Sequence, residues 1–218
     1  FLENIRTINK KIIFIYSSSD KAYGELKNRK DYKEGDSLDS TYPYDVSKSS
    51  SDLICQSYSK TYSMKVGIIR CGNIYGPGDF NLKRLIPEVI LSTIEKKNFI
   101  IRSDGKSTRD YVYVEDVADA YLKLLRKIKN SKKKLNIYNV SSKFNYSVLQ
   151  IVNMILKKMN NLKLKPIVLN NSKQELNFQR LNYSKIKREL KWKPKTDIEV
   201  GLRKTIDWYI KFYKFLKK

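Results

Sequence analysis

Residues 11–24 read KIIFIYSSSDKAYG, an apolar run followed by three serines, an aspartate, a lysine and a Tyr-Gly pair. The run at 11–16 predicts a buried strand, because short apolar runs bounded by polar and glycine-containing segments are typical of one. Neighbouring residues of a strand point to opposite faces. Asp20 and Lys21 can therefore serve one site only if the chain has left extended geometry there.

Strand and helix patterns alternate along the rest of the chain. The expected strands are 11–16, 66–70, 99–102, 135–140 and 165–169, and the expected helices are 44–63, 83–97, 115–129, 146–159, 183–190 and 198–215. Such alternation predicts an α/β fold with a parallel sheet. In open parallel sheets ligands bind beyond the carboxyl ends of the strands. The loop RCGNIYGPGD at 70–79 then lies on the same edge as SSSDKAYG.

Composition narrows the class of protein. The 218 residues include 41% hydrophobic residues, which is enough for a packed core. No apolar run reaches the ~18 residues of a membrane helix, and the charged start FLENIRTINKK does not resemble a signal peptide. We therefore expect a cytoplasmic protein with no membrane partner.

The formal net charge of +23 raises the possibility of nucleic-acid binding. The basic residues are spread along the chain, however, and the densest run, KNSKKK at 129–134, lies between a helix pattern and a strand pattern. A solvated loop is the simpler interpretation, so no nucleic-acid partner is expected. The chain has no histidine and only Cys55 and Cys71, so no zinc site, other metal cluster or disulfide framework is expected.

The segment TYPYDVSKSSSDLI at 41–54 places Tyr44 and Lys48 four residues apart on a helix that Pro43 can begin. An ammonium near a phenol stabilises the phenolate, so we expect Lys48 to lower the Tyr44 pKa from about 10 and make it a base toward a sugar hydroxyl. The spacing alone is weak, since Tyr-x-x-x-Lys pairs begin at Tyr23, Tyr44, Tyr183 and Tyr213. Among these four tyrosines, Tyr44 is the best candidate for the base, because its helix begins after a Ser-Ser-Asp segment at the end of a strand.

The order of these segments resembles a known family. The segments SSSDKAYG, YPYDVSK, RCGNIYGPGD, RLIPEVI, RDYVYVEDVADAY and GLRKTIDWY are similar, in order and spacing, to the extended short-chain dehydrogenases/reductases that act on nucleotide sugars. The Asp20-Lys21 pair, with GD and RLIP after the second loop, looks most like CDP-glucose 4,6-dehydratases; the dTDP-sugar dehydratases carry Asp-Glu at that place. One departure is Lys191 before Trp192, where the family usually has glycine.

The resemblance implies a Rossmann-like, doubly wound parallel sheet. Residues 1–75 would be the C-terminal half of the NAD-binding domain, and 76–218 mainly a smaller α/β substrate-binding region, with about 110–130 packing back on the sheet. The family opens with a glycine-rich turn that holds NAD, and no G-x-x-G-x-x-G occurs here. We expect about three βα units, roughly 100 residues at ~30 per unit, to precede Phe1, and this chain alone to be inactive.

The resemblance also implies a reaction and its partners. It implies NAD as cofactor, a nucleotide-sugar substrate, and a role in deoxysugar biosynthesis such as that of lipopolysaccharide. It also implies that the complete protein is a homodimer through the helix at 44–63, paired with a helix from the part expected to precede Phe1. A 4,6-dehydratase oxidises C4 of a hexose, removes water across C5 and C6, and returns hydride to C6. Tyr44 with Lys48 would act at the C4 hydroxyl and Ser19 would bind its oxygen. Asp20 would be the acid at C6, and Lys21 would take the place of the base at C5.

The remaining site residues are binding groups in the same resemblance. The residues implied at the cofactor are Ser18, Tyr44, Lys48 and Cys71, and those implied at the substrate are Asn73, Arg84 and Arg109. Guanidinium forks suit phosphate oxygens, so both arginines are expected at the diphosphate, although each could instead be a surface charge.

Alternatives to the dehydratase stay open. Asp20 and Lys21 could form only a strand-end salt bridge. The chain could then be an epimerase or decarboxylase on the same scaffold. A separate alternative is an inactive fragment that only binds a sugar nucleotide or a partner chain.

Overall fold

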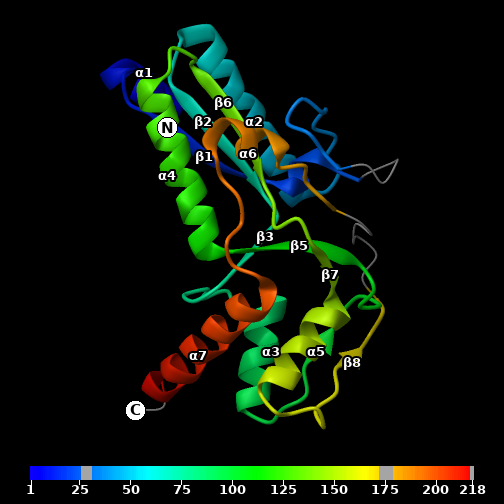
Figure 1. The fold of residues 1–218 in the computed structure, drawn as a ribbon. Coiled ribbons are helices and arrows are strands. Elements are labelled where there is room, and N and C mark those ends of the chain that lie inside the picture. The colour runs from blue at the N-terminus through cyan, green and yellow to red at the C-terminus, as the bar shows by residue number, and fades with distance from the viewer. Residues whose placement is uncertain (26–30, 172–178, 217–218) are drawn as a thin grey trace.

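The computed structural model describes residues 1–25, 31–171 and 179–216 (Figure 1). Its helices are α1 (Leu2–Asn9), the 3-10 helix η1 (Asp20–Tyr23), α2 (Pro43–Tyr62), α3 (Leu85–Ile94), α4 (Val114–Asn130), α5 (Val148–Lys158), α6 (Ser184–Leu190) and α7 (Ile198–Leu216). Its strands are β1 (Phe14–Ser19), β2 (Val66–Cys71), β3 (Asn73–Tyr75), β4 (Ile100–Ile101), β5 (Thr108–Tyr113), β6 (Leu135–Val140), β7 (Asn145–Ser147) and β8 (Ile167–Val168).

The main sheet is parallel, in the order β1-β2-β6, with helices on both faces (Figure 1). The middle strand β2 is buried along its whole length, as expected for a parallel sheet covered on both sides. Its alternate residues enter two cores: Val66 and Ile68 pack with α1 and α2, and Ile69 and Cys71 pack with α4 and α6. The predicted α/β fold with a doubly wound parallel sheet is confirmed.

A second sheet, β3-β5-β7, leads from the main sheet to the rest of the molecule (Figure 1). Strand β3 pairs parallel with β5, and β7 pairs antiparallel with β5. Below it, α3, α5 and α7 pack around an apolar core that includes Val89, Ile151 and Leu202. Strands β4 and β8 form a short parallel pair beside this core.

The first strand lies three residues later than predicted. It was expected at 11–16 and is observed at Phe14–Ser19. Ser17, Ser18 and Ser19 pair with Ile69, Arg70 and Cys71 of β2, and this backbone pairing does not depend on side-chain polarity. The chain then leaves extended geometry at Asp20, where η1 begins, which is the condition that Asp20 and Lys21 needed to serve one site.

Each predicted helix is present within a few residues of its expected bounds. The Pro43 position is correct, since it occupies the first turn of α2. Helix α4 packs against β2, β5 and β6. The division of the chain at residue 75 stays a prediction.

Candidate active site at the carboxyl edge of the sheet

A pocket of about 430 Å³ opens where β1 and β2 end. Its volume lies within the ~300–1,000 Å³ of small-molecule sites. Its wall combines residues of β1, η1, α2, β2, β3, β5, the loop after β3 and the start of α3. The predicted site residues on this wall are Ser18, Ser19, Lys21, Tyr44, Lys48, Cys71, Asn73 and Arg84.

Two predicted site residues lie elsewhere. Asp20 and Arg109 are only 3% and 6% exposed and are not part of the pocket wall within the described ranges. The Arg109 guanidinium donates to the Thr108 carbonyl at 2.9 Å, and its charge acts on the Asp20 carboxyl. The structure therefore places Asp20 and Arg109 together, in the interior behind the pocket.

Ser19 organises the turn at the end of β1. Its Oγ donates to Asp20 Oδ1 at 2.9 Å and accepts from the Lys21 backbone N–H at 3.2 Å. This is the capping arrangement that serine favours at a helix start. Because the turn begins there, Asp20 enters the interior while Lys21 lies on the pocket wall.

Burial sets the protonation of the Asp20 carboxyl. Removal from water raises its pKa from the usual 3.8, although the charge of Lys21, the Ser19 hydrogen bond and the charge of Arg109 act in the opposite direction. The protonated form is favoured more than in an exposed aspartate. This is the direction that a general acid needs.

The expected lowering of the Tyr44 pKa by Lys48 is wrong. Desolvation raises the Tyr44 pKa from its usual 10.0 and outweighs the opposing charge of Arg84. The Lys48 ammonium donates to the Ser17 carbonyl at 3.2 Å and lies 5.9 Å from the centre of the Tyr44 ring. The Ser19 hydroxyl also acts to lower the Tyr44 pKa, and desolvation outweighs this effect too.

The predicted site lacked several residues of the pocket wall, among them Asp79 and Tyr111. Asp79 forms an ion pair with Arg84, with 3.4 Å between Oδ2 and Nη1. Its place in the GPGD loop was a usable signal, since that loop was already expected at the ligand edge. Tyr111 lies in the segment RDYVYVEDVADAY that carried the family resemblance, but no role was assigned to it and β5 was not among the expected strands.

The structure has a parallel sheet covered by helices, with Tyr44 and Lys48 at the carboxyl ends of its strands. The chain is therefore an α/β protein with a small-molecule site at the strand ends. The family model described as "NAD dependent epimerase/dehydratase family" matches residues 1–141. The chain belongs to the NAD-dependent epimerase/dehydratase family.

Known proteins extend this likeness over nearly the whole chain. A probable dTDP-glucose 4,6-dehydratase of Sinorhizobium fredii is 30% identical over 212 residues, which cover 93% of this chain and 59% of that protein. A dTDP-glucose 4,6-dehydratase of Escherichia coli is 29% identical over 216 residues, covering 90% and 58%. The chain thus spans less than two thirds of the length of these relatives.

Solved structures show the same architecture. The dTDP-glucose 4,6-dehydratase of Bacillus anthracis, in complex with NAD, superposes with a TM-score of 0.87 at 28% identity over 98% of this chain and 66% of that one. The UDP-glucose 4-epimerase of Thermotoga maritima, with UDP-glucose, gives 0.87 at 26% identity over 97% and 67%.

Two further findings bear on the kind of protein. No helix in the described part of the chain is long and apolar enough to cross a membrane. Within the same ranges, no three His, Cys, Asp or Glu side chains gather as a set of metal ligands.

Proposed function

We propose that this chain carries the catalytic and sugar-nucleotide-binding residues of an NAD-dependent nucleotide-sugar 4,6-dehydratase, with CDP-glucose as the preferred substrate. The observation that carries the proposal is the turn at η1. It presents Lys21 to the pocket wall that also carries Ser19 and Tyr44, and it holds Asp20 in the interior with a raised pKa.

The pocket wall offers groups that fit a dinucleotide cofactor. The Ser18 hydroxyl is buried with no hydrogen-bond partner in the described residues, and it lies on the wall with Lys48 and Cys71. A buried hydroxyl of this kind is stabilised by a ligand that supplies a polar group. NAD, when bound, would accept hydride from C4 of the sugar and return it to C6. Ser18 and Lys48 would hold its nicotinamide riboside end.

Tyr44 and Ser19 would act at C4. Tyr44 would take the proton of the C4 hydroxyl as the C–H bond breaks, and Ser19, on the same pocket wall, would bind the same oxygen. Because burial raises the Tyr44 pKa, the phenolate needs a nearby positive charge. The charge of Arg84, on the same pocket wall, acts in that direction.

Lys21 and Asp20 would carry out the elimination. The 4-keto group acidifies the C5–H, Lys21 would take that proton, and the electron pair would form the C5–C6 double bond as the C6 hydroxyl leaves. Protonated Asp20 would supply the proton that turns this hydroxyl into water. Since Asp20 lies behind the wall and Ser19 Oγ is 2.9 Å from its carboxyl, Ser19 is placed to pass the proton on.

Arg84 is the best-placed residue for the substrate's diphosphate. Its side chain is 56% exposed on the pocket wall, and a phosphate could replace the long 3.4 Å contact with Asp79. Asn73, at the start of β3, lies on the same wall. The role of Arg109 at the diphosphate stays a prediction, and its buried position gives it less support.

A nucleotide-sugar 4-epimerase is the second candidate. The likeness to the Thermotoga maritima UDP-glucose 4-epimerase favours it, since the superposition scores as highly as that with the Bacillus anthracis dehydratase. An epimerase oxidises and reduces C4 alone and has no need of an acid and a base at C6 and C5. The Asp20-Lys21 pair therefore favours the dehydratase.

The test uses the protein expressed from its complete reading frame and supplied with NAD. CDP-glucose, dTDP-glucose and UDP-glucose are each offered, and the products are examined by mass spectrometry and proton NMR. A dehydratase gives a product that has lost one water and gained a C6 methyl signal, most rapidly from CDP-glucose. An isomer of unchanged mass would instead establish the epimerase, and faster reaction of dTDP- or UDP-glucose would correct the nucleotide.

The proposal also covers the oligomeric state of the complete protein and its location in the cell. Leu53 and Ile54 are 53% and 51% exposed on α2, the helix that also carries Tyr44 and Lys48. Apolar side chains at this level of exposure on one helix are a candidate subunit interface. We propose that the complete protein is a homodimer through α2. A cytoplasmic location stays a prediction.

A further inference from the structure

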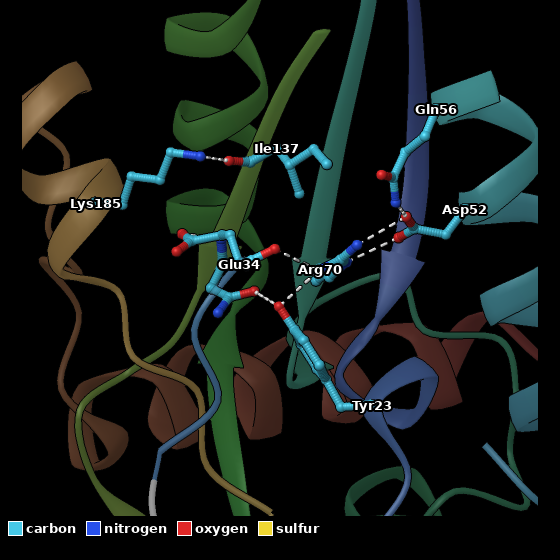
Figure 2. Close-up of polar contacts among 8 residues, drawn as sticks. Tyr23, Glu34, Asp52, Gln56, Arg70, Ile137 and Lys185 are labelled. Carbon is cyan, nitrogen blue, oxygen red and sulfur yellow. Dashed lines mark hydrogen bonds and ion pairs between the residues drawn. The ribbon is translucent and has the colours of Figure 1, made fainter. Parts of the chain in front are cut away.

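Behind the pocket, a buried arginine joins the elements that carry the site (Figure 2). Arg70, on β2, is 1% exposed. Its Nε and Nη2 donate to the two carboxylate oxygens of Asp52, both at 2.9 Å, and its Nη1 donates to the Tyr23 hydroxyl at 2.8 Å. Asp52 belongs to α2 and Tyr23 to η1, so one guanidinium links three elements.

The burial of the ion pair between Arg70 and Asp52 calls for a physical explanation. Taking both charges out of water carries a large free-energy cost, and replacing such a pair by apolar residues is often neutral or stabilising. Net stability is therefore a weak explanation for the pair of Arg70 and Asp52. What a bidentate fork does supply is a fixed relative position of the two elements it joins.

The Asp52 contact fixes the catalytic helix. Tyr44, Lys48 and Asp52 follow one another at intervals of four residues and so lie along one face of α2. Gln56, one turn further, donates to Asp52 Oδ1 at 2.8 Å and holds the carboxylate in place. The two hydrogen bonds from Arg70 to Asp52 thus fix the rotation of α2 about its axis and its position along that axis, relative to the end of β2.

The Tyr23 contact fixes the strand-end turn. Tyr23 follows Lys21 by two residues within η1 and is buried. Its hydroxyl accepts from Arg70 and donates to Asn139 Oδ1 at 2.8 Å, and its ring stacks on Tyr32 with 4.5 Å between the ring centres. Burial raises the Tyr23 pKa to about 12, which keeps the hydroxyl a donor. The turn cannot rotate without breaking these contacts.

We propose that Arg70 is a positioning residue with two separable effects on the reaction. Through Asp52 it places Tyr44 and Lys48 for the oxidation at C4, and through Tyr23 it places Lys21 and Asp20 for the elimination. Within the described residues, none of Arg70, Asp52 and Tyr23 lies on the pocket wall, so they act through the residues they hold. This inference rests on the proposed dehydratase function.

Tyr23→Phe tests the contact with the turn, in the protein from its complete reading frame. The substitution keeps the ring stack and removes one hydroxyl. We expect the first hydride transfer to change less than about twofold and the elimination to slow roughly 10–10²-fold, as a small misplacement of a reacting group does. Reduced NAD should then accumulate during turnover, by its near-ultraviolet absorbance, and deuterium exchange at C5 should fall.

Removing both charges tests the contact with the helix. Asp52→Asn alone would leave a buried cation without its partner and could prevent folding. The double variant Asp52→Leu with Arg70→Met removes both ions at similar volume. We expect it to fold with a melting temperature near that of the wild type, but with kcat for the first hydride transfer at least about tenfold lower and KM little changed. Because Arg70→Met also removes the donor to the Tyr23 hydroxyl, the elimination should slow as it does in Tyr23→Phe, and the added loss in the first hydride transfer is the effect of the helix contact.

Tyr138→Phe is the control, because it also removes one hydroxyl from a buried tyrosine, whose partner is Glu189 at 2.8 Å. It should leave both steps unchanged. If the wild type neither reduces NAD nor dehydrates any nucleotide hexose, the proposed function fails and this inference with it. If the wild type is a dehydratase but Tyr23→Phe slows both steps equally or neither, or the double variant turns over normally, then Arg70 only packs the core and the inference alone is wrong.

Discussion

Buried carboxyl groups near the pocket determine how single residues respond to pH. Asp110 is almost fully buried, and its Oδ1 accepts from the backbone N–H and the hydroxyl of Ser142 at 2.8 and 2.6 Å. Its Oδ2 has no hydrogen-bond partner among the described residues. Burial raises the Asp110 pKa from 3.8 to about 6, and the nearby Asp20 carboxyl adds to this effect. The fold therefore favours the neutral form of Asp110.

The Asp110→Asn variant tests this assignment through stability. Because the folded pKa is raised, the stabilisation that goes with protonated Asp110 is complete below the unfolded pKa of 3.8 and is lost as pH rises through about 6. Between about pH 4 and pH 7 the wild type should lose on the order of 2–3 kcal/mol that the variant keeps, at ~1.4 kcal/mol per pKa unit. Urea unfolding at several pH values measures both slopes.

Asp104→Asn is the matched control for this titration. Asp104 is exposed and accepts from the Lys106 backbone N–H at 2.8 Å, so its replacement should leave the slope unchanged. Parallel stability curves for wild type and Asp110→Asn would show that Asp110 is ionised in the fold and that the account of its burial is wrong.

At the scale of elements, the residue that follows α6 has a strained backbone conformation, which lowers the stability of the fold. Lys191 follows the helix with φ at +50°, in the left-handed region where side chains other than glycine are disfavoured. The family that the sequence resembles usually has glycine at this position, and glycine adopts such a φ without strain. The neighbouring Trp192 is buried, and its Nε1 donates to the Asp116 carbonyl at 2.9 Å, which holds the turn against α4.

Lys191→Gly should therefore stabilise the chain. Glycine adopts this φ without strain, and we expect the free energy of unfolding to rise by about 0.5–1 kcal/mol. Lys187→Gly, on the exposed side of the same helix, should lower it by about 1 kcal/mol. Urea denaturation of the three proteins gives both values. A loss of stability at 191 would mean that the lysine side chain makes a contact worth more than the strain.

Features of the fold that depend on nearby residues were predicted from the sequence, whereas features that depend on distant residues or on burial were not. Pro43 marked the start of α2 and the alternation of patterns gave the parallel sheet, because both are local features. The three serines of β1 were excluded from the strand, since their pairing with β2 depends on residues about fifty positions away. The interior positions of Asp20 and Arg109 and the raised Tyr44 pKa depend on burial, which no spacing in the sequence records.

At the scale of the whole molecule, the proposed α2 interface leads to a test of assembly. In the protein from its complete reading frame, Leu53→Glu with Ile54→Glu would place two carboxylates in the interface, and we expect a dimer to become a monomer in light scattering at micromolar concentration. Leu122→Glu on α4 is the control, because Leu122 is equally exposed on a different helix. A wild type that is monomeric, or a double variant that stays dimeric, would contradict the interface.

The measurement that tests the dehydratase proposal most directly returns to the turn after β1. Lys21→Met keeps much of the apolar stem and removes the amine. In the complete protein with substrate and NAD, we expect oxidation at C4 to proceed and elimination to slow by roughly 10²–10⁴. Reduced NAD should accumulate while deuterium exchange at C5 falls, whereas Tyr44→Phe should prevent reduced NAD from appearing. Normal turnover of Lys21→Met with C5 exchange intact would contradict the account, and the epimerase would then be the better proposal.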